Sequence, residues 1–125
     1  MTKIIVIDDE KPTLSMLCLL LEDAYEFQVF TAESGDAGIE LFKKERPSIV
    51  FTDIKMPGIS GLEVHEKLKA IDPSVRIIVM TGHGDQKLME KAISSGATAF
   101  IHKPIERQAL EDALKKSDAD VSPKE

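Results

Sequence analysis

The chain has 125 residues, of which 42% are hydrophobic and 30% are charged, and its formal net charge is −6. This length suits one domain with a substantial core, and the negative charge argues against nucleic-acid binding through bulk charge. A single cysteine, Cys18, excludes an internal disulfide and favours a reducing compartment. The sequence lacks a signal-peptide pattern and an apolar run of membrane-spanning length, so we expect a cytoplasmic protein that does not enter a membrane.

Apolar runs alternate with helix-period segments along the chain. The runs predict strands at residues 3–7, 27–31, 49–52, 77–80 and 99–102. The periodic segments predict helices over about 12–24, from the cap Ser34 to before Pro47, from the cap Ser60 to about Asp72, from the cap Asp85 to Gly96, and over about 106–116. This alternation predicts an α/β fold in which five parallel strands are covered by helices on both faces.

Polar residues of complementary chemistry follow four of the predicted strands. Asp8-Asp9 follow the first, Asp53 the third, Thr81 the fourth and Lys103-Pro104 the fifth. Because the carboxyl ends of parallel strands form one edge of a sheet, we expect these groups to meet there. Carboxylates packed together resist ionisation, and a divalent cation relieves their repulsion; an all-oxygen ligand set favours Mg²⁺. Each residue alone also has a simpler interpretation, as a helix cap, a turn residue, a buried hydroxyl or a surface lysine.

With Met56-Pro57-Gly58 after Asp53, these motifs resemble the receiver domains of two-component response regulators, the chemotaxis-regulator fold. The resemblance extends to about Lys116. It implies a flavodoxin-like three-layer sandwich with strand order 2-1-3-4-5, as known from chemotaxis regulators. We therefore expect a receiver domain at residues 1–117. Residues 118–125 are expected to form a polar tail that is disordered or begins a linker.

The resemblance also implies the roles of the carboxylates. Asp53 resembles the phosphoacceptor. Asp53, Asp9 and the backbone carbonyl of Lys55 resemble the direct ligands of Mg²⁺ (or Mn²⁺), and Asp8 resembles the residue that acts on the metal through water. The implied donor is a phosphohistidine on a sensor histidine kinase or a histidine phosphotransfer protein. The implied protein is a phosphoacceptor regulator with self-catalysed phosphotransfer and autodephosphorylation, and not an enzyme.

Thr81, Lys103 and Phe100 resemble the residues that bind the phosphoryl group and respond to it. Thr81 corresponds to the hydroxyl that contacts a phosphoryl oxygen, and Lys103 to its ion-pair partner, placed by a Lys103–Pro104 bond that is typically cis in this family. Phe100 corresponds to the aromatic residue that fills the space vacated by the hydroxyl, but it lacks the hydroxyl of the more common tyrosine. His102 shares a face with Phe100, and both are expected on the output surface of the fourth helix, fifth strand and fifth helix. The simpler interpretation of Phe100 is an ordinary aromatic residue of the strand core.

Two further pairs of residues are candidates for tuning the phosphorylated state and for docking a kinase. Lys55 and His83 follow Asp53 and Thr81 by two residues and resemble positions that tune the lifetime of the phosphorylated state; the alternative is that both are solvated loop side chains. In the first helix, Leu14 and Cys18 are expected to face outwards as a kinase-docking patch. The alternative is a scatter of exposed apolar residues.

Two alternative functions share parts of this pattern. A degenerate receiver would act only as a protein-binding module, although the complete set of polar residues argues against it. A haloacid-dehalogenase-like phosphatase would need a second aspartate two residues after Asp53, where the chain has Lys55. The resemblance also implies an output partner or an output domain that responds to the phosphorylated receiver.

Overall fold

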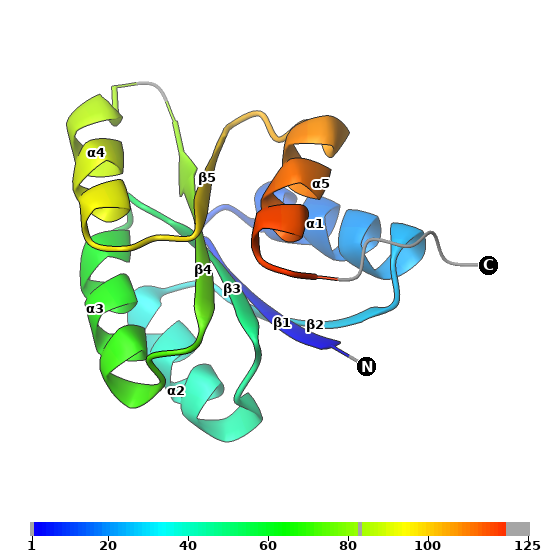
Figure 1. Ribbon diagram of the computed structural model, residues 1–125, viewed down its shortest axis with the longest axis horizontal. Coiled ribbons are helices and arrows are strands. Elements are labelled where there is room, and N and C mark those ends of the chain that lie inside the picture. Colours follow the sequence, from blue (N-terminus) through cyan, green and yellow to red (C-terminus); the bar gives the residue numbers. More distant parts are fainter. Residues whose placement is uncertain (1, 83, 120–125) are drawn as a thin grey trace.

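The computed structural model describes residues 2–82 and 84–119 and has five parallel strands in the order β2-β1-β3-β4-β5 (Figure 1). The strands are β1 (Thr2–Ile7), β2 (Phe27–Ala32), β3 (Ile49–Asp53), β4 (Arg76–Thr81) and β5 (Ala99–His102). The helices are α1 (Lys11–Ala24), α2 (Gly35–Glu45), α3 (Gly61–Ile71), α4 (Gln86–Ser94) and α5 (Arg107–Lys116). The predicted fold and strand order are confirmed, and the predicted elements differ from the observed ones only at their ends.

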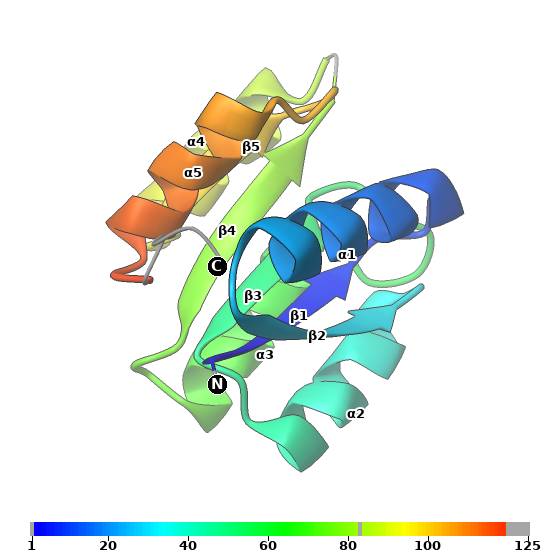
Figure 2. The same ribbon diagram turned by 90° about the vertical axis from the view of Figure 1, so that its right-hand side faces the viewer.

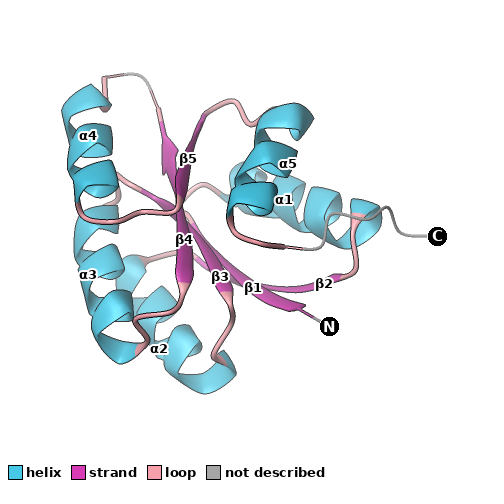
Figure 3. Ribbon diagram, viewed as in Figure 1, coloured by secondary structure: helices cyan, strands magenta, loops and turns pink. Residues whose placement is uncertain are grey.

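The helices form two outer layers around the sheet. Helices α1 and α5 lie on one side of the strands, and α2, α3 and α4 lie on the other (Figures 1 and 3). The central strands are therefore covered on both faces, as their continuous apolar runs predict. All strand arrows point to the same end of the sheet, so the polar residues that follow β1, β3, β4 and β5 gather at one edge (Figure 2).

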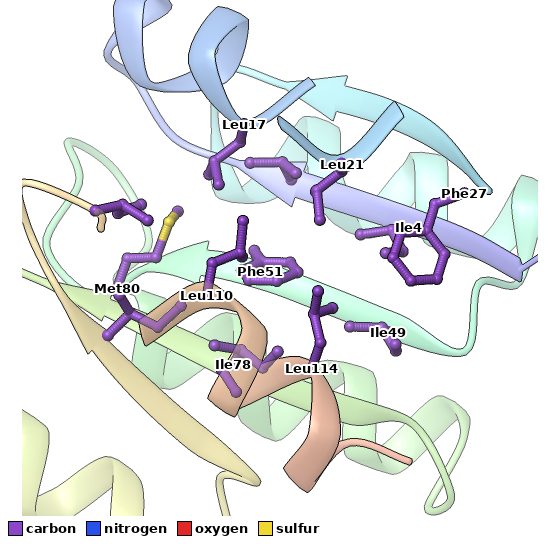
Figure 4. Packing of buried hydrophobic residues seen from close by; sticks show 14 of the residues in the cluster. Ile4, Leu17, Leu21, Phe27, Ile49, Phe51, Ile78, Met80, Leu110 and Leu114 are labelled. Carbon is purple, nitrogen blue, oxygen red and sulfur yellow. The ribbon is translucent and has the colours of Figure 1, made fainter. Parts of the chain in front are cut away.

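The core consists of two apolar clusters, one on each face of the sheet. Successive residues of β1 alternate between them: Ile4 and Val6 pack toward α1 and α5, whereas Ile5 and Ile7 pack toward α2, α3 and α4. Figure 4 shows the first cluster, in which side chains of α1 and α5 surround Phe51 of β3. Since both faces of β1 and β3 are buried, the sheet is a rigid base for the polar edge above it.

The expectation that Leu14 of α1 faces outwards is wrong. Leu14 is only 7% exposed and lies on the same sheet-facing stripe as Leu17 and Leu21, which have no exposed surface. The spacing of three and four residues between these leucines places all three on one side of the helix. Leu19 is the outward leucine, with 61% exposure, and Cys18 is half-buried. A docking patch that includes Leu14 therefore lacks the exposed side chain on which it was based.

Serine caps fix the start of two helices, as predicted. The Ser34 hydroxyl accepts a hydrogen bond from the Ala37 N–H of α2 at 3.1 Å, and the Ser60 hydroxyl accepts one from the Glu63 N–H of α3 at 3.3 Å. Asp85 stands at the N-cap of α4, but its side chain makes no cap bond within the described part of that helix. Its carboxylate instead accepts a hydrogen bond from the Gly82 N–H at 2.8 Å, which connects the residue after β4 to the start of α4.

The described chain continues past α5 by three residues. Asp118 forms an ion pair with Arg76 at 3.1 Å, and Ala119 packs against the first apolar cluster. The predicted polar tail, residues 118–125, otherwise lies outside the described residues, so its disorder stays a prediction. In the part of the chain that the structure describes, no helix has both the length and the apolar character needed to span a membrane.

Candidate functional site

The site is built where β1, β3 and β5 end. Asp8 follows β1, Asp53 is the last residue of β3, and Lys103 follows β5. The Lys103 ammonium nitrogen, Nζ, lies 2.8 Å from Asp8 Oδ2 and 3.2 Å from Asp53 Oδ2. The Lys103–Pro104 peptide bond is cis, as the family resemblance implied. The structure thus brings together two carboxylates and one ammonium from segments that are far apart in the sequence.

Glu10 completes this cluster and was not predicted. Its Oε1 lies 2.6 Å from Lys103 Nζ, and its backbone N–H donates to Asp8 Oδ1 at 2.8 Å. Among the described residues, carboxylate oxygens of Asp8, Glu10 and Asp53 lie within 4.8 Å of one another. Asp9, which was predicted as a direct metal ligand, is exposed and is not part of this group. A direct role for Asp9 in metal binding therefore stays a prediction.

Burial makes the two inner carboxylates difficult to ionise. Asp53 is 6% exposed, and burial raises its pKa to about 6, with a further upward contribution from the negative charge of Asp8 and an opposing one from Lys103. Asp8 has no exposed surface, and burial raises the pKa of this carboxyl as well, although its hydrogen bond and ion pair with Lys103 oppose the increase. Added positive charge would therefore stabilise the ionised form of both residues.

Lys103 is held in its charged form. Burial alone would lower the pKa of Lys103, but hydrogen bonds to Asp8 and Glu10 and the charge of Asp53 outweigh it, so the net shift is upward. The pKa of Glu10 is lowered, because its carboxylate accepts a hydrogen bond from Lys103. One ammonium is thus shared among three carboxylates, which leaves the cluster with excess negative charge.

The residues present fit a hard divalent cation. All the side-chain donors are carboxylate oxygens, the kind of ligand that Mg²⁺ prefers. Asp8 Oδ2 is buried and lies 2.8 Å from the Lys103 ammonium, whose charge offsets that of the carboxylate. The Lys55 N–H points at Asp53 Oδ1 from 3.5 Å, so the chain after β3 bends around the carboxylate, while the Lys55 side chain is exposed. Metal binding by the Lys55 carbonyl stays a prediction.

Thr81 ends β4 beside this cluster and is 1% exposed. Its Oγ1 lies 3.0 Å from Nδ1 of His102, a contact that was not predicted. The contact follows from the strand register, because Thr81 of β4 is paired with His102 of β5. The expectation that His102 shares a face with Phe100 is confirmed, since the two rings lie 5.5 Å apart in an edge-on arrangement. Phe100 is 38% exposed, so it is not an ordinary core aromatic. His83 lies outside the described residues.

Comparison with known proteins gives a consistent family assignment. The family model "Response regulator receiver domain" matches residues 4–115. The chain is 32% identical over 117 residues to Sporulation initiation phosphotransferase F of Bacillus subtilis, a match that covers 91% of each chain. It is 41% identical over 115 residues to Transcriptional regulatory protein FixJ of Azorhizobium caulinodans, where it spans 53% of the relative. The crystal structure of a response regulator receiver domain protein from Clostridium thermocellum superposes with a TM-score of 0.87 at 36% identity, covering 94% of each chain.

Proposed function

The chain belongs to the response regulator receiver domain family, and from this premise we propose that it accepts a phosphoryl group on Asp53 from a phosphohistidine of a histidine kinase or phosphotransfer protein. The observation that carries the proposal is the buried Asp53 carboxylate, which lies 3.2 Å from the Lys103 ammonium and next to a second buried carboxylate. Burying one carboxylate beside another costs free energy, and carboxylates in such an environment cluster at functional sites.

The proposed transfer joins one carboxylate oxygen of Asp53 to phosphorus while the bond between phosphorus and the imidazole nitrogen of the donor breaks. The product is a mixed carboxylic-phosphoric anhydride, which water hydrolyses. Lys103, already charged and in contact with Asp53, neutralises phosphoryl oxygens as the group arrives. A bound Mg²⁺ supplies further positive charge, which lowers the repulsion between the carboxylate and the phosphoryl group. We assign its binding to Asp53, Asp9 and the Lys55 carbonyl, with Asp8 acting through water.

The proposed signal is a change of the surface around β5. A phosphoryl group adds about −1.5 to −2 of charge at the site. The Thr81 hydroxyl follows this charge, and Phe100, which is 38% exposed on β5, responds to the movement of Thr81. These movements couple the site to the face formed by α4, β5 and α5, and an output partner or output domain recognises that face. Lys55 and His83 remain proposed as residues that tune the lifetime of the phosphorylated state.

A small-molecule phosphoryl donor tests the proposal directly. We expect acetyl phosphate with Mg²⁺ to add the mass of one phosphoryl group to the wild-type chain, as measured by intact mass spectrometry. Asp53→Asn should remain unmodified. Asp23→Asn, a matched change at an exposed position of α1, should be labelled like the wild type. Equal labelling of Asp53→Asn would overturn the assignment, and an unlabelled wild type would indicate a protein-binding module.

A phosphatase would behave differently in the same experiment. The regulator forms an adduct of one phosphoryl group per chain, whereas a haloacid-dehalogenase-like enzyme would release many equivalents of phosphate for each chain without retaining a phosphoryl group. No family match among the comparisons supports that alternative, and Lys55 occupies the position where that enzyme needs its second aspartate.

A further inference from the structure

The hydroxyl of Thr81 already has a hydrogen-bond partner before any phosphoryl group arrives. Its Oγ1 lies 3.0 Å from His102 Nδ1, an ordinary hydrogen-bond distance. The carbonyl oxygen of Ile101 is the other neighbour, but at 3.5 Å it is at the limit of a hydrogen bond. The imidazole is therefore the principal partner of the Thr81 hydroxyl, and the residue as a whole is only 1% exposed.

The contact follows from strand pairing. Thr81 and His102 are register partners on β4 and β5, so their side chains leave the sheet on the same face. The Lys103 N–H donates to the Thr81 carbonyl at 2.7 Å and holds the two strands together at this point. On its other side, the imidazole packs edge-on against Phe100 with a ring separation of 5.5 Å and an interplanar angle of 77°. His102 thus links the buried hydroxyl to an exposed aromatic residue.

The surroundings leave room for both side chains to move. A cavity of about 280 Å³ lies beside Thr81, and its lining includes Asp85, Met89, His102 and Lys103. Among the residues that line it, the Asp85 carboxylate accepts a hydrogen bond from the Gly82 N–H. A shift of the hydroxyl or of the imidazole into this space does not require the sheet to deform.

We propose that His102 is a positioning residue that restrains the Thr81 hydroxyl in the unphosphorylated protein, an inference that rests on the proposed function of Asp53. In this assignment the imidazole carries a proton on Nε2 and none on Nδ1, so that Nδ1 accepts a hydrogen bond from the Thr81 hydroxyl. A hydroxyl has a single proton to donate, so donation to a phosphoryl oxygen and donation to His102 exclude each other. Phosphorylation then breaks the hydrogen bond between Thr81 and His102, and the imidazole beside Phe100 is no longer held by the hydroxyl. Nothing covalent changes at His102.

Substitution of His102 separates this role from a structural one. The probe is beryllium fluoride with Mg²⁺, a non-covalent phosphoryl mimic, titrated and followed by fluorine NMR. His102→Leu should bind the mimic about threefold to tenfold more tightly than the wild type, because the competing hydrogen bond is lost. His102→Asn, whose side-chain oxygen replaces Nδ1 as acceptor, should bind like the wild type. Equal affinities for His102→Leu and wild type would overturn the inference, and so would a failure of His102→Asn to restore wild-type affinity.

Two further readouts guard against indirect effects. In a Thr81→Val background, His102→Leu should leave the affinity unchanged, because the hydroxyl that it restrains is absent. In the wild type, nitrogen NMR should show His102 Nδ1 without a proton before addition of the mimic, and a changed Nδ1 signal afterwards. An Nδ1 that carries the proton in the unliganded protein would contradict the inference. A wild type that takes up neither beryllium fluoride nor the acetyl phosphate label would instead overturn the proposed function itself.

Discussion

The interior of the sheet and its polar edge are both buried, but burial has opposite effects in the two regions. Ile7 and Asp8 are consecutive residues, and neither has exposed surface. Removing Ile7 from water stabilises the fold, whereas removing the Asp8 carboxylate from water destabilises it unless opposite charge compensates. At the end of β1, a residue whose burial stabilises the fold is therefore followed directly by one whose burial destabilises it.

Compensation at the edge depends mainly on one side chain. Lys103 contacts Asp8, Glu10 and Asp53, and its side chain is only 18% exposed. The interior has no such dependence, because its stability is spread over two clusters of apolar residues on the two faces of the sheet. The edge is therefore sensitive to added charge, whereas the stability of the sheet beneath it does not depend on one side chain.

The largest expected effect belongs to the interior. Leu17→Ala should lower the free energy of unfolding by about 4 kcal/mol, because the residue is fully buried under α1 and leaves a cavity. The matched control is Leu19→Ala on the same helix, which is 61% exposed and should change stability by less than about 0.5 kcal/mol. Urea unfolding followed by circular dichroism measures both. Similar losses for the two variants would contradict the described rotation of α1.

The next effect belongs to the edge. Lys103→Met should lower the free energy of unfolding by about 3 kcal/mol at neutral pH, because it leaves buried carboxylates without their counter-charge. Lys3→Met provides the control, because Lys3 also forms an ion pair, with Glu45, but its side chain is 40% exposed. We expect that substitution to change stability by less than about 1 kcal/mol in the same urea experiment. Equal effects would show that Lys103 is an ordinary surface lysine.

Removal of a carboxylate should have the opposite sign. The pKa of Asp53 rises from 3.8 to about 6 on folding, so the folded protein binds its proton more tightly than the unfolded chain. Its contribution to stability is therefore present at low pH and is lost as the pH rises from about 4 to about 6. Without metal, Asp53→Asn should be more stable than the wild type by about 2 kcal/mol at pH 7 and should show a smaller decline over this interval.

Urea midpoints measured between pH 4 and pH 7 in the presence of a chelator test this prediction. Asp23→Asn on the exposed side of α1 should follow the wild-type curve. If the stability of the wild type instead rose over this interval in parallel with that of Asp53→Asn, folding would not raise the pKa of Asp53.

The smallest expected effect concerns Glu10, at the exposed rim of the cluster. Glu10→Gln removes one negative charge and releases Lys103 from a 2.6 Å ion pair, so the pKa of Asp53 should fall below its wild-type value. Carbon NMR titration of the Asp53 carboxyl measures the change. Glu33→Gln, which alters an exposed pair with Lys11 at 3.9 Å, should leave this pKa unchanged. An unaltered Asp53 titration in Glu10→Gln would remove Glu10 from the functional cluster.

The sequence predicts the sheet and the convergence of Asp8, Asp53 and Lys103, because both follow from local periodicity and from the geometry of parallel strands. It does not determine the rotation of α1. Six apolar residues in succession, 16–21, are compatible with more than one buried stripe, and tertiary packing selects the one that contains Leu14. The direction of the Glu10 side chain at the start of α1 is likewise set by Lys103, which lies 93 residues away in the chain.

The contact between Thr81 and His102 was missed for a related reason. It depends on the register between two separate strands, and a shift of one residue would have turned His102 to the other face. Hydrophobic pattern specifies register only where both faces of a strand are clearly distinguished, and β5 has just four residues. Pairwise contacts at strand ends therefore require the three-dimensional structure.

The most direct test of the account is the effect of Mg²⁺ on the stability of the wild type and of Asp53→Asn. A cation that binds only the folded edge raises the free energy of unfolding with increasing concentration. We expect saturating Mg²⁺ to stabilise the wild type and to abolish the advantage in stability that Asp53→Asn has in the presence of chelator. An equal gain in both proteins, or none in the wild type, would contradict the central claim that these carboxylates form a magnesium-dependent phosphorylation site.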